Sequence, residues 1–253
     1  MEQPVDVEHL THPEIRNLRA DALFRGDTRR AAELAAVLAG RERRYHTGEM
    51  LDIYDDSLRP LGVRERGRVH LEGDWHRSFQ CWLVSPARRS VIVQRRAASK
   101  ATYPLALDTS VAGHYRAGEG VADACRETEE ELGLRVDADR LVPLGRSVCT
   151  ARHGCLIDRE VAEVFLYATD AAPAALRPDP VEVAEVLEVP LQPLLALFCG
   201  AAADAPALTC RPGHAPLATR IRAEEFTVHL GRYYPRVVFQ ALRLADGLPP
   251  LFL

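Results

Sequence analysis

Apolar residues near the amino terminus recur every three or four positions, which is the period of an amphipathic helix. One such segment begins near Pro13 and ends at Gly26, and a second runs from Asp27, a residue type that caps helices, to Gly40. The pattern predicts a helical hairpin over residues 12–40. Its apolar stripe must cover either the main domain or a second subunit, so a homodimer is one of two expected arrangements.

From residue 50 the apolar runs shorten and become rich in β-branched and aromatic residues, with Gly and Pro between them, as is typical of strands. One helical segment separates the third run from the fourth, and this order favours a layered α/β or α+β domain. A last strand and a short helix are expected after residue 180, whereas residues 200–216, rich in Ala and Pro, predict a linker or a surface loop. The runs that predict strands are 50–56, 78–84, 90–96, 142–150 and 161–169.

These patterns divide the chain into three parts. Residues 1–48 are expected to form an N-terminal helical extension, residues 49–200 the main domain, and residues 201–253 a C-terminal extension that packs on that domain. The C-terminal part is expected to hold another helix or strand pair, and none of its residues suggests a chemistry.

Composition and charge narrow the class of protein. With 253 residues, of which 47% are hydrophobic and 27% charged, the chain can bury a core and has a globular composition. Its first residues are neither basic nor apolar, and no stretch reaches the length of a membrane span, so we expect a cytoplasmic protein without a membrane partner. A net charge of −4 argues against a nucleic-acid partner and favours a small molecule.

The six cysteines include no CxxC pair and stand in segments expected to be core or helix. We interpret them as reduced structural thiols. A zinc site from Cys149, Cys155, Cys210 and His214 is the alternative, although its spacing differs from that of compact zinc motifs.

Acidic residues gather in one short segment, where five glutamates fall between residues 119 and 131. Residues 121–132 favour a helix, and Gly133 is a natural place for it to end. Like charges on one helix face repel by roughly 0.2–0.5 kcal/mol per pair. The carboxylates that share a face, at positions i, i+3 and i+4, are those of Glu127, Glu130 and Glu131.

Two interpretations account for this acidic face. In the first it is solvated, and Arg126 partly offsets the charge of Glu130 one turn later. In the second the carboxylates share Mg²⁺, a cation that takes hard oxygen ligands and is held by carboxylates together with substrate phosphates. Glycines ahead of the helix favour the second, because they let the backbone bend closely around a ligand. These glycines are Gly113, Gly118 and Gly120.

The segment resembles the signature of the Nudix hydrolases, G-x5-E-x7-R-E-U-x-E-E-x-G-U, in which U is aliphatic. It departs from the signature twice: six residues instead of seven separate Glu119 from Arg126, and Thr128 stands where an aliphatic residue is usual. We expect the shortening to fall in the turn before the helix, so any displacement should affect Glu119, which in the family braces the loop against the helix. The matching residues are Gly113, Glu119, Arg126, Glu127, Glu130, Glu131, Gly133 and Leu134.

Residues 73–84, 90–104 and 107–114 resemble the branch of Nudix proteins related to isopentenyl-diphosphate isomerase. The whole resemblance covers about residues 50–195. It implies a mixed sheet between helices, in a Nudix-like α/β/α sandwich. It also implies hydrolysis of a diphosphate linkage in a nucleoside diphosphate derivative or a related organic diphosphate, with Mg²⁺, or alternatively Mn²⁺, as cofactor.

By this resemblance Glu127, Glu130 and Glu131 are catalytic metal ligands, and one of them accepts a proton from the attacking water. Arg126 is expected to orient Glu127, and the carbonyl of Ala112 to complete the metal shell. Diphosphate hydrolysis needs charge neutralised on the phosphoryl oxygens and a water held in line, which clustered cations provide.

A further metal-binding carboxylate is expected from a residue that follows this signature segment in the chain. Glu182 is preferred as this metal ligand, ahead of Glu185 and Glu163, and the alternative is a strand that exposes alternate charges to water. The residues expected to bind substrate are Arg95, Arg96, Lys100, His114 and Gly113, with ordinary surface cations as the alternative for the first three. His76 and Arg77 have a weaker claim than His114, because a histidine beside a tryptophan is more often a packing residue.

Two other functions are kept as alternatives. An isopentenyl-diphosphate isomerase would need a cysteine near residues 107–114, where this chain has Thr109, Ser110 and Val111, and the nearest thiol in sequence is Cys125. A non-catalytic nucleotide-binding or regulatory protein would have no reason to keep the repelling carboxylates. A Mg²⁺-dependent hydrolase is therefore preferred over both.

Overall fold

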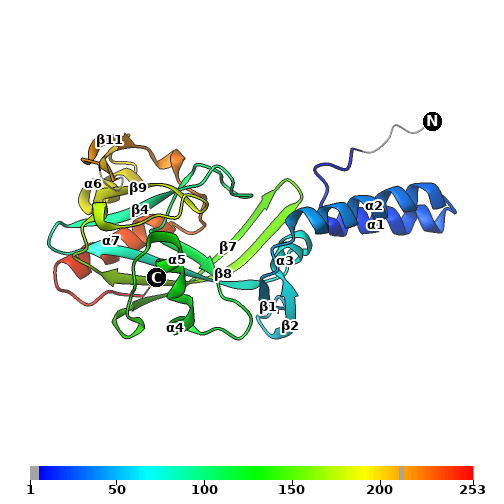
Figure 1. Ribbon diagram of the computed structural model, residues 1–253, viewed down its shortest axis with the longest axis horizontal. Helices are drawn as coiled ribbons and strands as arrows, with labels where there is room; N and C mark the ends of the chain where they lie inside the picture. Colours follow the sequence, from blue (N-terminus) through cyan, green and yellow to red (C-terminus); the bar gives the residue numbers. More distant parts are fainter. Residues whose placement is uncertain (1–5, 211–213, 253) are drawn as a thin grey trace. The chain divides into compact units, whose positions relative to one another are not determined.

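The structure is a computed structural model that describes residues 6–210 and 214–252. The chain divides into two units, and each is described by itself. Unit 1 holds residues 6–77, 116–118 and 148–161, and unit 2 holds residues 78–115, 119–147 and 162–252. Within the described residues, none of the helices is long and apolar enough to cross a membrane. Figure 1 labels the elements in chain order.

Unit 1 begins with the predicted pair of helices, α1 (His12–Phe24) and α2 (Thr28–Tyr45). Thr11 caps α1 in a reciprocal capping box, and the side chain of Asp27 caps α2 by accepting a hydrogen bond from the N–H of Arg30, at 2.9 Å. The second helix runs past Gly40, where the sequence predicted its end, because a glycine inside a helix weakens it without ending it.

A β-hairpin and a short helix follow in unit 1. Strand β1 (Met50–Tyr54), which was predicted, pairs antiparallel with β2 (Pro60–Glu65), which was not, and α3 (Arg66–Glu72) ends at Gly73 in the left-handed conformation. Val69 of α3 packs on Leu51 in a small core. The sequence pattern missed β2 because the strand is largely exposed, and α3 because seven residues are too few to display a helical period.

A mixed sheet of nine strands forms the centre of unit 2, although the parts of β3, β7 and β8 within residues 76–77 and 148–161 belong to unit 1. Its order is β11-β10-β9-β4-β3-β8-β7, with β5 paired to β4 and β6 paired to β3. The pairs next to the acidic segment, β4 with β9 and β3 with β6, are antiparallel. The strands are β3 (His76–Ser85), β4 (Ser90–Arg96), β5 (Leu107–Asp108), β6 (Val111–His114), β7 (Val142–His153), β8 (Leu156–Ala168), β9 (Val183–Pro190), β10 (Ala205–Cys210) and β11 (Leu217–Ile221).

Helices cover both faces of this sheet, as the predicted α/β/α sandwich requires (Figure 1). On one face α6 (Leu191–Phe198) and α7 (Tyr233–Ala245) pack on Trp82. On the other face α4 (Val121–Ala124) and α5 (Arg126–Leu132) pack through buried apolar residues that include Phe79, Ile92 and Leu132. Single turns of 3₁₀-helix lie at Ala138–Arg140, Pro173–Ala175 and Ala223–Glu225.

The expectation of a loop over residues 200–216 is wrong. Strand β10 lies there and pairs with both β9 and β11, while residues 211–213 lie outside the described part of the chain. Ala205 and Ala207 are buried, whereas Pro206 and Leu208 are exposed. The side chains do alternate, but small residues on the buried face and apolar ones on the exposed face hide the period of two in the sequence.

Candidate active site

The acidic segment forms the predicted helix, with a slight break. Helices α4 and α5 meet at Cys125, which keeps right-handed helical dihedral angles. Gly133 ends α5 in the left-handed conformation, with its N–H bonded to the Glu129 carbonyl (2.9 Å) and the Leu134 N–H bonded to the Thr128 carbonyl (3.2 Å). The Thr128 hydroxyl donates to the Cys125 carbonyl at 2.7 Å, so this departure from the signature is satisfied inside the helix.

Arg126 organises the start of α5. Its Nε and Nη2 donate to the two carboxylate oxygens of Glu119, each at 2.9 Å, and Nη2 also donates to the His114 carbonyl at 3.1 Å. Its Nη1 donates to the carboxylates of Glu127 and, at 3.0 Å, of Glu130. All five N–H groups of the guanidinium are thereby used.

The shortened loop therefore leaves Glu119 in contact with the helix. A bidentate pair between Arg126 and a carboxylate fixes both groups in one plane. Burial alone would lower the pKa of Arg126, but the hydrogen bonds from it to Glu119 and the negative charge of Glu127 outweigh burial and raise that pKa.

The glutamates of α5 fall into two sets. Glu127 and Glu131 are buried, with 8% and 4% of their surface exposed, and Glu130 stands nearer to solvent with its side chain 47% exposed. Glu129, the position that the signature leaves open, is exposed and pairs with Arg135 at 2.8 Å. Glu129 and Glu130 are thus similarly exposed and differ in their partners, since Glu130 faces Arg126 and Glu129 faces Arg135.

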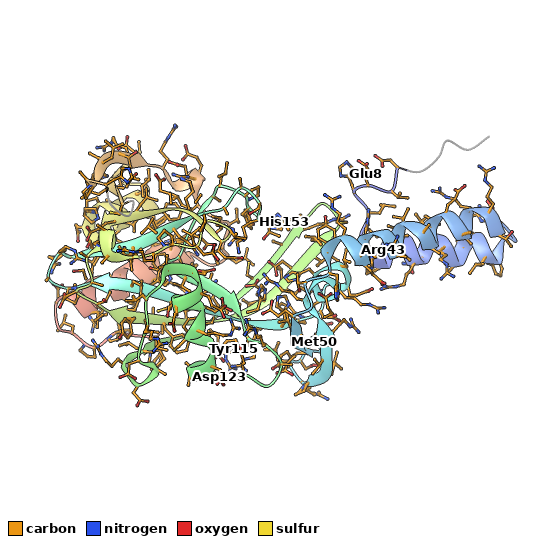
Figure 2. The ribbon with its side chains drawn as sticks, viewed as in Figure 1. Glu8, Arg43, Met50, Tyr115, Asp123 and His153 are labelled. Carbon is orange, nitrogen blue, oxygen red and sulfur yellow. The ribbon has the colours of Figure 1, made fainter. Side chains whose placement is uncertain are left out.

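Gly113 makes room for the first of these carboxylates. A Cβ atom built on Gly113 would lie 2.1 Å from the carboxyl carbon of Glu127, far inside contact distance. Any other residue at position 113 would push the Glu127 carboxylate away. Figure 2 labels Tyr115, directly after β6, and Asp123, in α4.

Glu131 is the most deeply placed carboxylate of the set. Its Oε2 accepts hydrogen bonds from the side-chain amide of Gln94 (3.1 Å) and from the N–H of Ala112 (3.3 Å). Burial raises the pKa of Glu131 well above its usual range, and the charge of Lys100 opposes this rise while that of Glu127 adds to it. A cation in front of Glu131 would remove the cost of ionising it.

Lys100 lies near enough to Glu131 for its charge to act on that carboxylate. Backbone N–H groups of Arg177 and Asp179 donate to the carbonyls of Leu132 (2.8 Å) and Glu131 (3.0 Å), which attaches the loop before β9 to α5. Lys100 forms an ion pair with Glu182. The structure therefore brings the preferred extra carboxylate and one expected substrate-binding cation close to the helix.

Arg95 and Arg96 are both engaged by acidic residues. Arg95 pairs with Glu185 and Glu225, each at 3.2 Å, and Arg96 pairs with Asp108 at 3.0 Å. Arg96 also donates to the Thr102 carbonyl. The contact with Thr102, together with one from Arg95 to the Leu105 carbonyl at 3.1 Å, attaches the loop over residues 97–106 to the sheet, a role that the sequence did not suggest.

Glu163, the least favoured extra carboxylate, has other partners. Its two oxygens accept hydrogen bonds from the Tyr115 hydroxyl at 2.9 Å and from Arg146 at 3.1 Å. The residue is buried, and these two donors stabilise its carboxylate there.

A second set of metal-type ligands lies within unit 1. Nε2 of His76 lies 3.8 Å from carboxylate oxygens of both Asp158 and Glu160, and Nε2 of His70 lies 3.9 Å from Asp158. Each Nδ1 faces a backbone carbonyl, that of Arg66 at 2.8 Å for His70 and that of Asp74 at 3.0 Å for His76. When each ring carries its proton on Nδ1, bonded to that carbonyl, its unprotonated Nε2 faces the carboxylates.

Burial lowers the pKa of His70 to about 3 and also lowers the pKa of His76, so both rings are neutral. Neutral imidazoles with carboxylates suit zinc and similar transition metals better than Mg²⁺. No sequence spacing revealed this set, because its members come from α3, β3 and β8.

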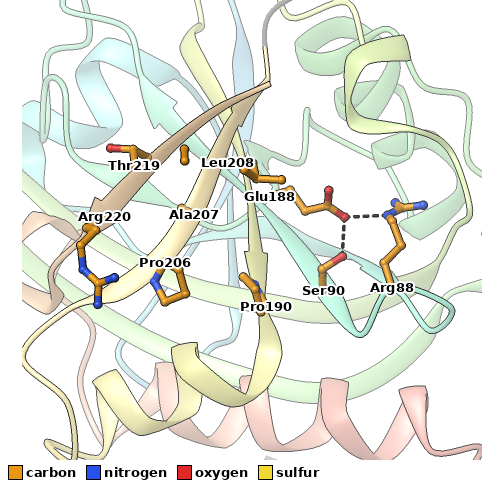
Figure 3. A pocket seen from close by; sticks show the side chains of 10 residues that line it. Arg88, Ser90, Glu188, Pro190, Pro206, Ala207, Leu208, Thr219 and Arg220 are labelled. Atoms are coloured by element: carbon orange, nitrogen blue, oxygen red, sulfur yellow. Dashed lines mark hydrogen bonds and ion pairs between the residues drawn. The ribbon is translucent and has the colours of Figure 1, made fainter. Parts of the chain in front are cut away.

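A pocket of about 550 Å³ lies along β9, β10 and β11, and its lining includes no residue predicted for the diphosphate site. Figure 3 shows Glu188 at its edge, accepting hydrogen bonds from Arg88 at 2.6 Å and from Ser90. Between the charged groups the wall is formed by Pro190, Pro206, Ala207, Leu208 and Ala218. The pocket is thus a feature separate from the acidic helix.

Comparison with known proteins identifies the family. The family model of the NUDIX domain matches residues 74–209. An uncharacterized Nudix hydrolase of Clostridium acetobutylicum is 37% identical over 125 residues, which are 49% of this chain and 61% of that protein. Nudix hydrolase 3 of Arabidopsis thaliana is 34% identical over 122 residues, 47% of this chain and 16% of that protein. The chain thus spans less than two thirds of the length of these two relatives.

Relatives with another name also match. An isopentenyl-diphosphate Delta-isomerase of Mycolicibacterium vanbaalenii is 34% identical over 149 residues, which are 58% of this chain and 80% of that enzyme. A solved structure from Deinococcus radiodurans is 23% identical, with a TM-score of 0.45, over 60% of this chain and 90% of that one. The domain match and the acidic helix agree, and this protein belongs to the Nudix family of hydrolases.

Proposed function

We propose that this protein is a Mg²⁺-dependent hydrolase that cleaves the diphosphate linkage of a nucleoside diphosphate derivative or a related organic diphosphate. The observation that carries the proposal is the arrangement around Arg126, which ties Glu119, Glu127 and Glu130 together beside the buried Glu131. The single positive charge of Arg126 cannot offset all of these carboxylates, so a further cation would lower the cost of holding them this close.

The donor set fits a hard divalent cation. Glu127, Glu130 and Glu131 would hold it, together with the carbonyl of Ala112 and the carboxylate of Glu182. The space that Gly113 leaves for the Glu127 carboxylate supports this assignment. When bound, Mg²⁺ or Mn²⁺ would neutralise charge on the phosphoryl oxygens and lower the pKa of water.

The chain's own residues would position the reactants. Arg126 holds Glu127 and Glu130, and one of the three glutamates accepts the proton of the attacking water. Lys100 would exchange its contact with Glu182 for a phosphate oxygen of the substrate. Arg95, Arg96, His114 and the backbone at Gly113 are the other residues proposed to bind substrate.

The structure favours hydrolysis over isomerisation at this site. Thr109 and Ser110 are buried, and their hydroxyls donate to the carbonyls of Cys81 and Ile92. Burial raises the pKa of the Cys81 and Cys125 thiols, and a thiol with a raised pKa is a poor proton donor or nucleophile. The isomerase alternative would need an acid or base other than these groups.

The experiment that tests the proposal is a screen for hydrolysis of nucleoside di- and triphosphates, nucleotide sugars, dinucleotides and prenyl diphosphates, in which the monophosphate products are separated and identified. Each compound is assayed with Mg²⁺, with Mn²⁺ and with EDTA. We expect at least one diphosphate to be hydrolysed and EDTA to abolish its hydrolysis. Metal-independent hydrolysis, or none across the panel, would contradict the proposal. Homodimer formation through residues 12–40 remains a separate prediction.

A further inference from the structure

Gln94 is a polar residue in an otherwise apolar place. It lies on β4, a strand hydrogen-bonded on both sides, opposite Asp108 of β5 and Val186 of β9. Only 2% of its surface is exposed, and its neighbours along the strand, Ile92 and Val93, are core residues. Burying an amide in such a position is costly unless its polar atoms are satisfied.

The side-chain N–H group of Gln94 is satisfied by the acidic site. Nε2 donates to Oε2 of Glu131 at 3.1 Å, and the N–H of Ala112 donates to the same oxygen at 3.3 Å. Both hydrogen bonds fall on Oε2, so they hold the carboxylate by one oxygen and leave Oε1 of Glu131 for another ligand.

The carbonyl half of the amide has no hydrogen-bond partner within residues 6–210 and 214–252. Among the described residues no group donates a hydrogen bond to Oε1 of Gln94, although that atom is buried. Since the two polar atoms of an amide are neighbours, this acceptor lies beside the Glu131 carboxylate. A buried acceptor next to a carboxylate suits a donor that arrives with the ligands, and water is the donor that a hydrolase must bind there.

We propose that Gln94 positions Glu131 through its N–H group and also acts as a catalytic residue, because its Oε1 accepts a hydrogen bond from the water that attacks the diphosphate. This inference rests on the proposed function. Gln94 would act through Glu131 and the water without touching the substrate. Its loss should therefore lower kcat and metal affinity while leaving KM nearly unchanged.

The test replaces Gln94 by methionine, which has a similar length but neither an N–H donor nor a carbonyl. Partners that orient metal ligands are typically worth 10–100-fold in metal affinity or activity, so we expect Gln94→Met to weaken Mn²⁺ binding in calorimetry and to lower kcat by about that factor. KM should stay within about threefold. Gln94→Asn is the second variant, in case the methionine variant folds poorly. It keeps a buried amide but withdraws it from Glu131, so it should also lower Mn²⁺ affinity and kcat.

Gln80→Met is the matched control. Gln80 is also a buried strand glutamine of unit 2, but its carbonyl accepts a hydrogen bond from the Tyr233 hydroxyl. The control should lose stability without losing Mn²⁺ affinity. The inference is overturned if Gln94→Met and Gln94→Asn bind Mn²⁺ as the wild type does, or if Gln80→Met weakens binding equally.

The calorimetry also separates this inference from the proposed function. Mn²⁺ binding is measured without substrate, so it tests Gln94 whatever the substrate screen returns. A wild-type protein that binds Mn²⁺ through Gln94 and Glu131 but hydrolyses no diphosphate would contradict the proposed function, and with it the contact between Gln94 and the attacking water, but not the role of Gln94 in fixing Glu131.

Discussion

Arg126 uses each of its five N–H groups, and a lysine in its place could satisfy at most three of the acceptors. Arg126→Lys should therefore release Glu119 or Glu127 and lower turnover by about 10–100-fold. Arg135→Lys is the control, because Arg135 is exposed and pairs only with Glu129 among the contacts described. The control should keep wild-type turnover and lose no more than about 0.5 kcal/mol of stability. Equal activity of the two variants would contradict the role of Arg126.

Gly113 contributes space instead of contacts. In Gly113→Ala the new Cβ would collide with the Glu127 carboxyl group, the flexible end of a side chain that can swing aside. The fold should survive while the carboxylate moves, and a misplacement of about 1 Å can cost roughly 100-fold in rate. Steady-state turnover and thermal unfolding measure the two effects.

Gly120→Ala is the matched control for Gly113→Ala. A Cβ on Gly120 would meet only a carboxylate oxygen of Asp123 at 3.8 Å, an ordinary contact. The control should keep the wild-type rate. A loss of rate in both variants, or in neither, would show that the space beside Glu127 is not what position 113 provides.

The glutamates of α5 were predictable as site residues because their spacing along one helix itself indicates that they share a face. Gln94 was not, because it belongs to the same face as Glu131 only once β4 and α5 are packed together. The partners of Arg95, which are Glu185 and Glu225, also lie far from it in sequence. Sequence spacing fixes neighbours within one element, whereas contacts between elements depend on the tertiary fold.

The helices and strands show the same contrast: those determined by local sequence were predicted, and those determined by contacts with distant segments were missed. The helices with long apolar stripes and the strands with β-branched runs were predicted, and α5 ends at Gly133 as expected. Strand β10 was missed because its position is decided by pairing with β9 and β11. The short helix α3 was missed for lack of length, although it carries His70.

Helix α1 is attached to α3 by a charge interaction that depends on pH. Glu72 of α3 accepts hydrogen bonds from His12, at 3.4 Å, and from Arg16. Burial alone would raise the pKa of Glu72, but these hydrogen bonds outweigh burial and lower that pKa to about 2. A carboxyl group with a lowered pKa stabilises the fold above its unfolded pKa of about 4.5 and loses this contribution as the pH falls towards 2.

The attachment of α1 should therefore weaken between pH 4.5 and 2. Because the Arg16 side chain is about half exposed, we expect a loss of only about 1–2 kcal/mol. Hydrogen exchange of the α1 amides, compared with Glu72→Gln at each pH, measures it. The variant should exchange faster than the wild type at pH 6 and equally fast near pH 2. A constant difference across this range would contradict the account.

At the scale of the whole molecule, every residue proposed to bind metal or substrate belongs to unit 2. A ligand that binds only the folded state stabilises it by about 2.7 kcal/mol at a concentration 100 times its Kd. Saturating Mn²⁺ should therefore raise the unfolding temperature reported by Trp82, a core residue of unit 2, in a Trp75→Phe background. The shift should disappear in Glu131→Gln, and a shift that persists there would place the metal elsewhere.

The most direct test of the central claim compares neighbouring glutamates of α5. Formation of the monophosphate product from a hydrolysed diphosphate is measured against Mg²⁺ concentration for the wild type, Glu129→Gln, Glu130→Gln and Glu131→Gln. Glu129 is exposed and pairs with Arg135, so its variant should match the wild type. The other two should lose at least about 100-fold in rate, because each removes a carboxylate from the cation. Turnover that survives in Glu130→Gln and Glu131→Gln, or falls equally in Glu129→Gln, would contradict the claim that these carboxylates act together on a divalent cation.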